Sequence, residues 1–199
     1  MKNKPVLVVI AGPNGAGKTT ITQQLLKHRW LNNTVYVNPD IIAQDKFGGW
    51  DNKDSFIKAA NLAKEIRNNC IERKKNLVFE TVFSTQEKIN FVKKAIKCGF
   101  FIRFFFIATE EPTINARRIA LRFIEGGHEV PINKIISRHY KSIKNCKEII
   151  SIVDRAYFYD NSIDGVSPKL IFRVVNKDKQ IVKQYEPMLD WTQAIFNSI

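Results

Sequence analysis

The sequence has few cysteines, and they are not arranged as in a metal site or a disulfide framework. The three cysteines are Cys70, Cys98 and Cys146, which are far apart and form no C-x-x-C pair. An odd number at this spacing is not typical of a disulfide scaffold or of a zinc site. We therefore expect three reduced thiols in a cytoplasmic protein.

Long apolar runs are also missing. The first apolar run, Val6 to Ile10, is too short to cross a membrane, and the residues before it lack the layout of a signal peptide. There is also no internal repeat, low-complexity segment or linker that would divide the chain. Its 44% hydrophobic and 26% charged residues are ordinary for a globular protein. We expect one domain over residues 1–199, without a membrane partner.

Acidic residues are scarce relative to basic ones. The chain has 32 Lys and Arg against 19 Asp and Glu, which gives a formal net charge of +13 at pH 7. Such a charge fits a surface for nucleic acid or another anionic partner. It also fits a lysine-rich solvated surface together with a site that holds phosphate groups. Because the basic residues are spread along the chain and form no single basic arm, we favour the second interpretation and do not expect nucleic acid as a partner.

The most specific motif follows the first apolar run. Residues 12–19 read G-x-x-x-x-G-K-[ST], the phosphate-binding P-loop. The run before the motif predicts a buried strand, and Ile21, Leu25 and Leu26 share one face of the helix predicted after it. Strand, glycine-rich loop and helix form the context that the motif requires. The residues predicted to bind ATP are Gly12, Pro13, Asn14, Gly15, Ala16, Gly17, Lys18, Thr19 and Thr20.

The motif has a direct physical explanation. Its glycines allow backbone angles that bring N–H groups close to phosphate oxygens, and the helix that follows adds its positive end. Lys18 is predicted to reach the β- and γ-phosphates of ATP, and the hydroxyl of Thr19 to ligate Mg²⁺. The loop therefore indicates binding of a nucleoside triphosphate with its metal ion.

One acidic residue follows the second predicted strand. Residues 34–38 predict a strand that Pro39 ends, and Asp40 comes next. Ligands of open α/β sheets bind at the carboxyl ends of the strands, so Asp40 is a candidate catalytic and substrate-binding residue. The alternative is that Asp40 is the N-cap of a helix that begins at Ile41.

A second acidic residue ends the third predicted strand, over residues 76–81. Glu80 departs from the usual pattern of a hydrophobic strand that ends in Asp before a Mg²⁺ ion. We predict that Glu80 holds Mg²⁺ through water or contacts the acceptor, with Thr81 beside it. The alternative is a buried structural carboxylate.

The segment from about residue 113 to 150 is predicted to be a lid. Arg118 and Arg122 share a helix face at i, i+4, a Gly-Gly-His tip follows at 126–128, and a second helix carries Arg138. Such a lid closes over phosphates, supplies guanidinium groups to the developing charge and excludes water. The alternative is a surface helix hairpin with solvated arginines. The histidine of the tip is interpreted as a lid contact or a solvated loop residue rather than a base.

The remaining apolar runs complete an α/β pattern. Residues 100–108 are the most apolar stretch and predict a central strand buried on both faces. We expect a further core strand over 151–159, a β-hairpin over 169–184 and a terminal helix over 188–196 packed on the outside. The predicted fold is that of a P-loop NTPase, α/β, with a mostly parallel central sheet flanked by helices, a helical arginine lid and a C-terminal β-hairpin.

Taken together, these pieces resemble the zeta toxin family of P-loop kinases. The resemblance covers residues from about 5 to 175 in consistent order. The segments that carry it are 12–20, Asn-Pro-Asp at 38–40, Phe-Glu-Thr at 79–81, 118–131 with its Gly-Gly-His-x-Val-Pro, and Tyr-Asp-Asn-Ser at 159–162.

The resemblance implies a role for each matching residue. Lys18 and Thr19 would hold ATP and Mg²⁺, Asp40 would take the proton of the acceptor hydroxyl, and Glu80 would lie in the substrate pocket. The lid arginines that would neutralise the transferred phosphoryl group are Arg118 or Arg122, together with Arg138. Family members phosphorylate a sugar hydroxyl of UDP-N-acetylglucosamine-type sugars, and some are toxins restrained by an antitoxin, which implies a possible partner of that type.

These observations predict an ATP- and Mg²⁺-dependent kinase that phosphorylates a hydroxyl of a small molecule. One alternative is a kinase of polynucleotide ends, suggested by the basic charge. Another is a non-catalytic module whose nucleotide state controls an interaction surface. Asp40 argues against the latter, because such a switch has no use for an acceptor base.

Overall fold

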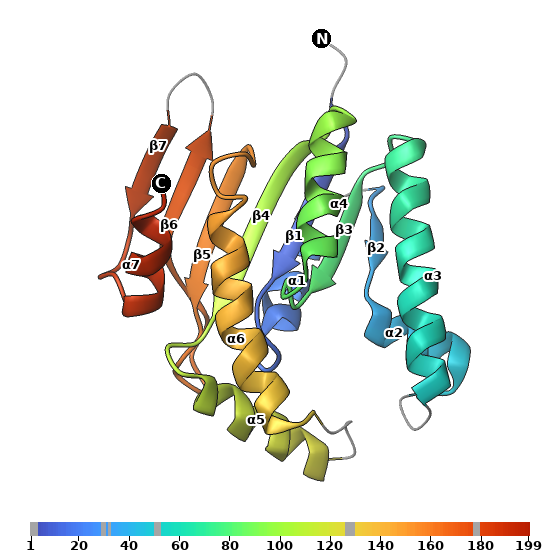
Figure 1. The fold of residues 1–199 in the computed structure, drawn as a ribbon, viewed down its shortest axis with the longest axis horizontal. Coiled ribbons are helices and arrows are strands. Elements are labelled where there is room, and N and C mark those ends of the chain that lie inside the picture. The colour runs from blue at the N-terminus through green and yellow to red at the C-terminus, as the bar shows by residue number, and fades with distance from the viewer. Residues whose placement is uncertain (1–3, 29–30, 32, 50–52, 126–129, 177–179) are drawn as a thin grey trace.

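The chain is built around one sheet (Figure 1). The computed structural model describes residues 4–28, 31, 33–49, 53–125, 130–176 and 180–199. Its strands are β1 (Val6–Ala11), β2 (Val35–Val37), β3 (Leu77–Thr81), β4 (Phe101–Ala108), β5 (Arg155–Asp160), β6 (Lys169–Asn176) and β7 (Gln180–Gln184). Within the described residues the strand order is β2-β3-β1-β4-β5-β6-β7. The first five strands in this order pair in parallel, and β6 pairs antiparallel with both β5 and β7, which confirms the predicted mostly parallel sheet and C-terminal hairpin.

The helices cover the two faces of the sheet unequally. They are α1 (Lys18–Leu26), α2 (Pro39–Phe47), α3 (Lys53–Glu72), α4 (Gln86–Lys97), α5 (Pro112–Ile124), α6 (Ile132–Lys147) and α7 (Asp190–Phe196). Figure 1 shows α3, α4, α6 and α7 on one face, α1 behind the sheet, and α2 and α5 beyond the carboxyl ends of the strands. The chain therefore leaves two helices at the edge where ligands of parallel sheets bind.

The core is arranged around β4, which lies between β1 and β5. Side chains of a strand alternate between its faces. Phe104 and Phe106 accordingly pack into the cluster under α3, α4, α6 and α7, and Phe105 and Ile107 pack into the cluster under α1. All four side chains are buried, which confirms the predicted central strand.

Two predicted boundaries were wrong. Pro39 does not simply end a strand, because β2 stops at Val37 and Pro39 begins α2 with Asn38 as the N-cap. Proline suits the first helical position, where its missing N–H has no partner to lose. The strand expected from residue 151 begins at Arg155, because residues 151–154 form turns.

The terminal helix is also more deeply packed than expected. Trp191 of α7 is 5% exposed, and its ring lies 5.8 Å from that of Phe106, centroid to centroid. Ile195 is fully buried in the same cluster. The hairpin and α7 are therefore part of the core rather than an external addition.

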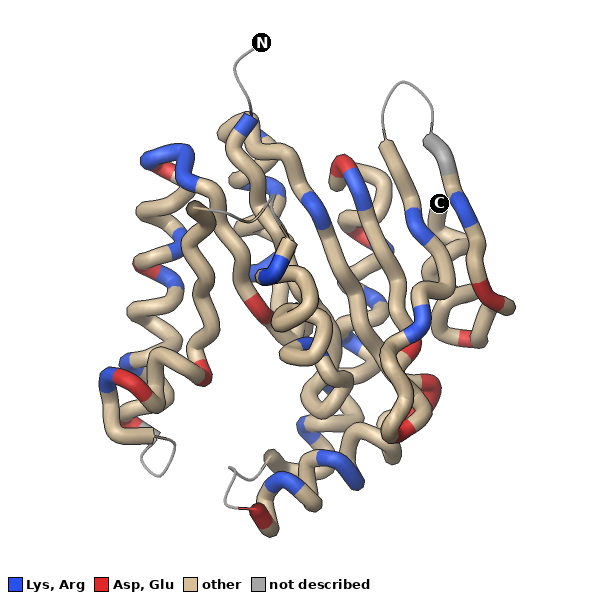
Figure 2. Tube along the Cα trace, turned by 180° about the vertical axis from the view of Figure 1, so that it is seen from behind, with Lys and Arg blue, Asp and Glu red and all other residues tan. Residues whose placement is uncertain are grey.

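The surface agrees with the charge pattern of the sequence. Figure 2 shows Lys and Arg on most elements and no single basic block on the face in view. None of the helices in the described residues is both long and apolar enough to cross a bilayer. Cys70, Cys98 and Cys146 are free thiols.

Candidate active site

The shape of the P-loop depends on two of its glycines. Gly12 has φ 150° and Gly17 has φ 84°, angles that favour glycine. A Cβ on Gly12 would lie 1.9 Å from the carbonyl oxygen of Ile107, and a Cβ on Gly17 would lie 2.2 Å from Nδ2 of Asn161. At Gly12 the close neighbour is backbone, and at Gly17 it is a side-chain amide that would have to shift to make room.

Two asparagines from distant elements hold the loop in place. Nδ2 of Asn115, on α5, donates to the carbonyl oxygen of Asn14 at 2.6 Å. Nδ2 of Asn161, just after β5, donates to that of Ala16 at 2.9 Å. Sequence reasoning did not assign either role, although Asn161 stands in one of the segments that carry the family resemblance. Its place directly after a core strand was the available signal, whereas nothing marked Asn115.

Lys18 lies at the centre of the site. Its Nζ donates to two carbonyl oxygens of the loop, both at 2.9 Å. Burial lowers the pKa of Lys18, and the carboxylates of Glu80 and Asp40 oppose that fall. The guanidinium groups of Arg122 and Arg138 lower the pKa further. These four side chains are therefore close enough to Lys18 to affect its charge.

Glu80 is a fixed carboxylate at the end of β3. It is 8% exposed, and the hydroxyl of Tyr36 donates to its Oε1 at 2.7 Å. Asn38 donates in turn to the Tyr36 hydroxyl at 3.1 Å. Burial and the bond to Glu80 raise the pKa of Tyr36, so the hydroxyl keeps its proton and remains a donor. The sequence did not reveal Tyr36, because its role depends on the pairing of β2 with β3.

The oxygen atoms near Glu80 are of the kind that Mg²⁺ prefers. The hydroxyl of Thr19 lies 3.4 Å from Oε2 of Glu80. Mg²⁺ is usually bound by one or two protein oxygens together with substrate phosphates and water. No group of three or more His, Cys, Asp or Glu suited to a metal occurs among the residues that the structure describes. The donor set therefore fits an ion brought by a nucleotide better than a metal bound by protein alone.

Asp40 lies in the first turn of α2 and does not cap it. Its backbone N–H donates to Oδ1 of Asn38 at 2.9 Å, so Asn38 is the N-cap. The predicted alternative role of Asp40 as the cap is therefore wrong. The carboxylate of Asp40 lines both of the cavities described next.

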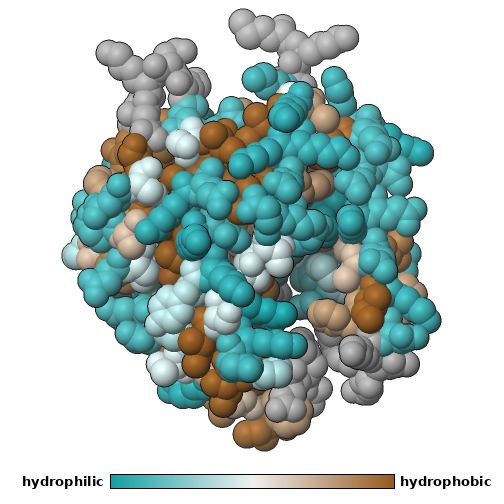
Figure 3. Space-filling view, in the orientation of Figure 1, coloured by the Kyte–Doolittle hydropathy of each residue, from teal (hydrophilic) through white to brown (hydrophobic). Residues whose placement is uncertain are grey.

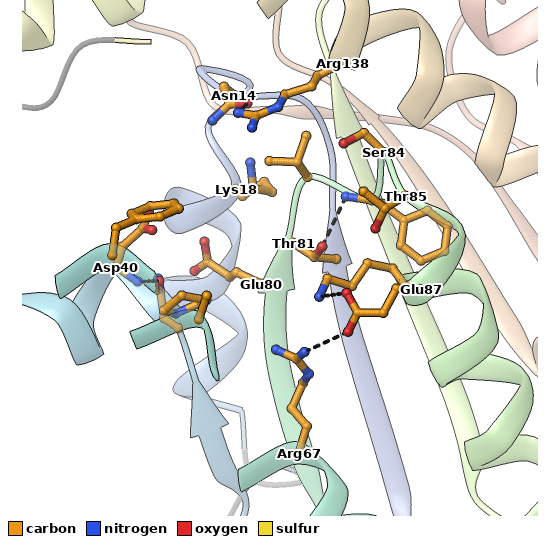
Figure 4. A pocket seen from close by; sticks show the side chains of 17 residues that line it. Asn14, Lys18, Asp40, Arg67, Glu80, Thr81, Ser84, Thr85, Glu87 and Arg138 are labelled. Atoms are coloured by element: carbon orange, nitrogen blue, oxygen red, sulfur yellow. Dashed lines mark hydrogen bonds and ion pairs between the residues drawn. The ribbon is translucent and has the colours of Figure 1, made fainter. Parts of the chain in front are cut away.

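Two cavities meet at this edge of the sheet. The loop cavity, of about 370 Å³, is lined by the P-loop, Arg122 and Val130. The α3 cavity, of about 380 Å³, extends between α3, the end of β3 and the start of α4 (Figure 4). The residues that line both cavities are Asn14, Lys18, Asp40 and Glu80. Figure 3 shows the molecule hollowed between the two halves of this edge.

Thr81 lines the α3 cavity as the second predicted acceptor contact on β3. Its Oγ1 accepts a hydrogen bond from the backbone N–H of Phe83 at 3.1 Å. This bond orders the turn that leads into α4, while the side chain still faces the cavity (Figure 4).

The structure separates the three predicted lid arginines. Arg122 lines the loop cavity, and Arg138 lines the α3 cavity while its NH1 donates to Oδ1 of Asn14 at 3.3 Å. Arg118 lines neither cavity. Its Nε donates to Oδ1 of Asp164 at 2.7 Å, and its NH1 donates to the carbonyl oxygen of Gly15 at 3.4 Å. Arg118 thus braces the loop from outside, and Arg122 and Arg138 face Lys18.

The helices of the predicted lid are present as α5 and α6. They pack against each other beside the carboxyl edge of the sheet (Figure 1). The predicted tip at 126–128, with His128, lies outside the described residues.

Comparison with known proteins places the chain in a family. A sequence model of the family described as Zeta toxin matches residues 1–164. The chain belongs to the zeta toxin family. The resemblance predicted from the sequence is therefore confirmed, and with it the P-loop kinase fold.

Individual relatives of this zeta toxin family member have different names. A Clostridioides difficile (strain 630) protein named guanylate kinase is 27% identical in an alignment of 210 positions that covers 94% of this chain and 94% of that protein. The structure of the PezAT toxin–antitoxin system of Streptococcus pneumoniae matches with a TM-score of 0.62 at 18% identity, over 80% of this chain and 70% of that one. A complex of AvrRxo1-ORF1 and AvrRxo1-ORF2 matches with a TM-score of 0.67 at 16% identity, over 87% and 60%. At these identities the structural likeness shows the fold alone.

Proposed function

We propose that the protein is an ATP- and Mg²⁺-dependent kinase that transfers the γ-phosphoryl group to a hydroxyl of a small molecule. A UDP-N-acetylglucosamine-type sugar is the first candidate acceptor. The observation that carries the proposal is the meeting of two cavities at Lys18, Asp40 and Glu80. A donor in the loop cavity and an acceptor in the α3 cavity would face each other across these three side chains.

The loop cavity supplies what phosphoryl transfer needs most, which is positioning and neutralisation of charge. The backbone N–H groups of the P-loop and Lys18 hold the triphosphate. Thr19 and Glu80 would hold Mg²⁺, which neutralises charge on the phosphates when bound. Arg122 and Arg138 would stabilise the charge that develops on the transferred group.

Asp40 completes the reaction on the acceptor side. The acceptor hydroxyl oxygen forms a bond to the γ-phosphorus while the bond from that phosphorus to the β–γ bridging oxygen breaks, and ADP leaves. The hydroxyl proton passes to the carboxylate of Asp40. General-base catalysis of this kind contributes roughly 10²–10⁴-fold to the rate.

A second candidate acceptor is the phosphate of a nucleoside monophosphate. It is favoured by the relative named guanylate kinase, which covers nearly the whole chain. The junction of the cavities favours the hydroxyl, because the carboxylates of Asp40 and Glu80 would repel an incoming phosphate. Transfer to GMP that does not need Asp40 would support this second candidate.

A kinase of polynucleotide ends remains an alternative within the same chemistry. The Pnkp1/Rnl/Hen1 RNA repair complex contains a chain that matches with a TM-score of 0.58 at 15% identity, over 74% of this chain and 47% of that one. This alternative predicts oligonucleotide binding that weakens steeply with salt.

The non-catalytic module predicts instead slow hydrolysis of ATP, no phosphorylated acceptor, and a partner bound in only one nucleotide state. Whichever of these activities the protein has, an antitoxin-type protein is a proposed partner, by analogy with the PezAT system.

The deciding experiment is incubation of the protein with ATP, Mg²⁺ and a panel of UDP-sugars, nucleosides, GMP and oligonucleotides. Mass spectrometry then shows which compound gains a phosphate. We expect a gain on a hydroxyl of a UDP-sugar. A gain on GMP or on an oligonucleotide alone would replace the proposed acceptor class, and hydrolysis of ATP with no phosphorylated product would support the non-catalytic module.

A further inference from the structure

The α3 cavity contains a buried cation that the proposed reaction does not use. Arg67 of α3 is 3% exposed, and it lines the cavity with Glu87 and Lys88 of the first turn of α4. Figure 4 shows its guanidinium group pointing up between Glu80 and Glu87, on the side of the cavity away from Asn14 and Arg138. Sequence reasoning did not single out any of the three residues of this cluster.

The hydrogen-bonding capacity of Arg67 is largely unused. A guanidinium group carries five N–H donors. One nitrogen, NH2, lies 3.5 Å from Oε1 of Glu87, and Nε has no hydrogen-bond partner within the described part of the chain. Buried polar groups are normally satisfied, whereas Arg67 keeps spare hydrogen-bonding capacity in the wall of a cavity.

The guanidinium group of Arg67 lies over two aromatic rings. Its guanidinium carbon lies 5.2 Å from the ring centroid of Phe79 and 5.5 Å from that of Phe91. Stacking on aromatic faces stabilises a guanidinium without consuming its N–H groups. The packing therefore fixes the position of the positive charge and leaves its donors for the cavity.

The charges around Arg67 are not balanced. Nζ of Lys88 lies 2.8 Å from Oε2 of Glu87, so the single carboxylate is shared by two cations. Arg67, Lys88 and Glu87 together carry one net positive charge. The amino end of α4 adds its partial positive charge there, and Thr85, its N-cap residue, makes no capping hydrogen bond with its side chain.

We propose that Arg67, Lys88 and the amino end of α4 form a subsite for an anionic group of the acceptor, a phosphate ester or a carboxylate. The hydroxyl that receives the phosphoryl group lies at Asp40 and the anionic group lies at Arg67. The substrate class is thus a hydroxyl compound with a negative charge at its far end. The proposal rests on the proposed function, because it assigns the α3 cavity to the acceptor.

The test measures binding without turnover. Protein saturated with the non-hydrolysable analogue AMP-PNP and Mg²⁺ has its P-loop filled, so that further anion binding reports on the α3 cavity. Calorimetric titration then compares anionic ligands (UDP-N-acetylglucosamine, N-acetylglucosamine 1-phosphate and glucuronic acid) with neutral N-acetylglucosamine. We expect at least one anionic ligand to bind at least tenfold more tightly than the neutral sugar, and the phosphate and carboxylate members show which anion is preferred.

Three variants assign that binding to the subsite. Arg67→Met keeps the apolar stem on Phe79 and Phe91 but removes the charge, and Lys88→Met removes the more accessible cation. Both should weaken the preferred anionic ligand at least tenfold, with the affinity for AMP-PNP changed less than twofold. The control is Lys58→Met, on the exposed side of α3, which lines neither cavity.

The outcomes separate the subsite from the proposed reaction. Equal binding of neutral and anionic sugars, no binding of any anionic ligand, or unchanged affinity in folded Arg67→Met and Lys88→Met proteins would each overturn the subsite. If Arg67→Met does not fold, as judged by circular dichroism, Lys88→Met decides alone. A protein that binds the anion at Arg67 but transfers no phosphate to a hydroxyl would contradict the proposed function and leave the subsite standing.

Discussion

The two cavities that meet at Lys18 are built in different ways. The wall of the loop cavity comes mainly from one continuous segment, residues 14–20, whose backbone is forced into shape by glycines. The wall of the α3 cavity comes from side chains on the start of α2, on α3, on the end of β3, on α4 and on α6. A sequence motif can describe the first kind of wall but not the second, so donor binding is far easier to read from a sequence than acceptor identity.

The largest expected effect on phosphoryl transfer comes from substitution of Asp40, which lines both cavities. We expect Asp40→Asn to lower phosphoryl transfer by roughly 10²–10⁴-fold, because the acceptor hydroxyl loses its base. Binding of ATP should change less than twofold, since the P-loop is untouched. Transfer is followed by mass spectrometry and binding by calorimetry.

The matched control for this variant is Asp45→Asn, an exposed residue on the same helix that lines neither cavity. It should change neither quantity. Loss of ATP binding together with transfer in Asp40→Asn would count against the assignment of Asp40 to the acceptor side.

The next effect distinguishes the lid arginines. Arg122→Met should lower transfer by roughly 10²-fold, the usual cost of losing one group that stabilises transition-state charge. Arg118→Met should cost much less, because Arg118 is held by Asp164 and lines neither cavity. Single-turnover rates of the two variants, measured side by side, check the ranking. An equal loss in both variants would contradict the assignment of Arg122, rather than Arg118, to the transferred group.

A smaller effect concerns the backbone of the loop cavity. Gly17→Ala places a Cβ 2.2 Å from Nδ2 of Asn161 at φ 84°. We expect the free energy of unfolding to fall by about 1–3 kcal/mol and nucleotide affinity to fall with it. Gly48→Ala is the control, since its φ is 75° but nothing lies within 4 Å of the added Cβ. If thermal unfolding shows the same loss in both variants, the positive φ rather than the close contact explains it.

The smallest effect concerns α6, which brings Arg138 to the α3 cavity. His139, the next residue, is 1% exposed, and burial lowers its pKa from 6.5 to about 4. The folded protein resists protonation of His139 between these values while the unfolded chain accepts it. The contribution of neutral His139 to the free energy of unfolding is therefore complete above pH 6.5 and is lost as the pH falls towards 4.

The measurement for His139 is chemical denaturation at a series of pH values. The variant His139→Phe should lose the part of the slope between pH 6.5 and 4 that the histidine causes. A slope that is identical in the variant would show that other groups are responsible.

The sequence predicted those features that depend on neighbouring residues. The P-loop, the buried run of β4 and the hairpin were visible as local patterns, and the structure confirms the elements that they predicted. The start of α2 was missed because proline ends a strand and begins a helix equally well, and only the N-cap at Asn38 decides between the two.

The missed residues of the site depend on contacts between distant segments. Tyr36 meets Glu80 only because β2 pairs with β3, and Asn115 meets the P-loop across about a hundred residues of chain. Nothing in the sequence distinguished Arg67, which the structure places over two phenylalanine rings. No local pattern carries such information, because each of these residue types is common on any surface.

The hydrogen bond between Asn115 and Asn14 ties the start of α5 to the P-loop. Asn115 is fully buried at the root of the helix, whereas Ile124 at the other end is 80% exposed. Arg122 stands seven residues after Asn115 on α5, which is about 10 Å along the helix at a rise of 1.5 Å per residue. Between these two residues, Arg118 donates to the carbonyl oxygen of Gly15 and to the carboxylate of Asp164, so the first half of α5 is bonded to the P-loop at more than one point. The position of Arg122 therefore depends on the same loop backbone that is predicted to hold the triphosphate, and a change in that backbone would reach Arg122 through α5.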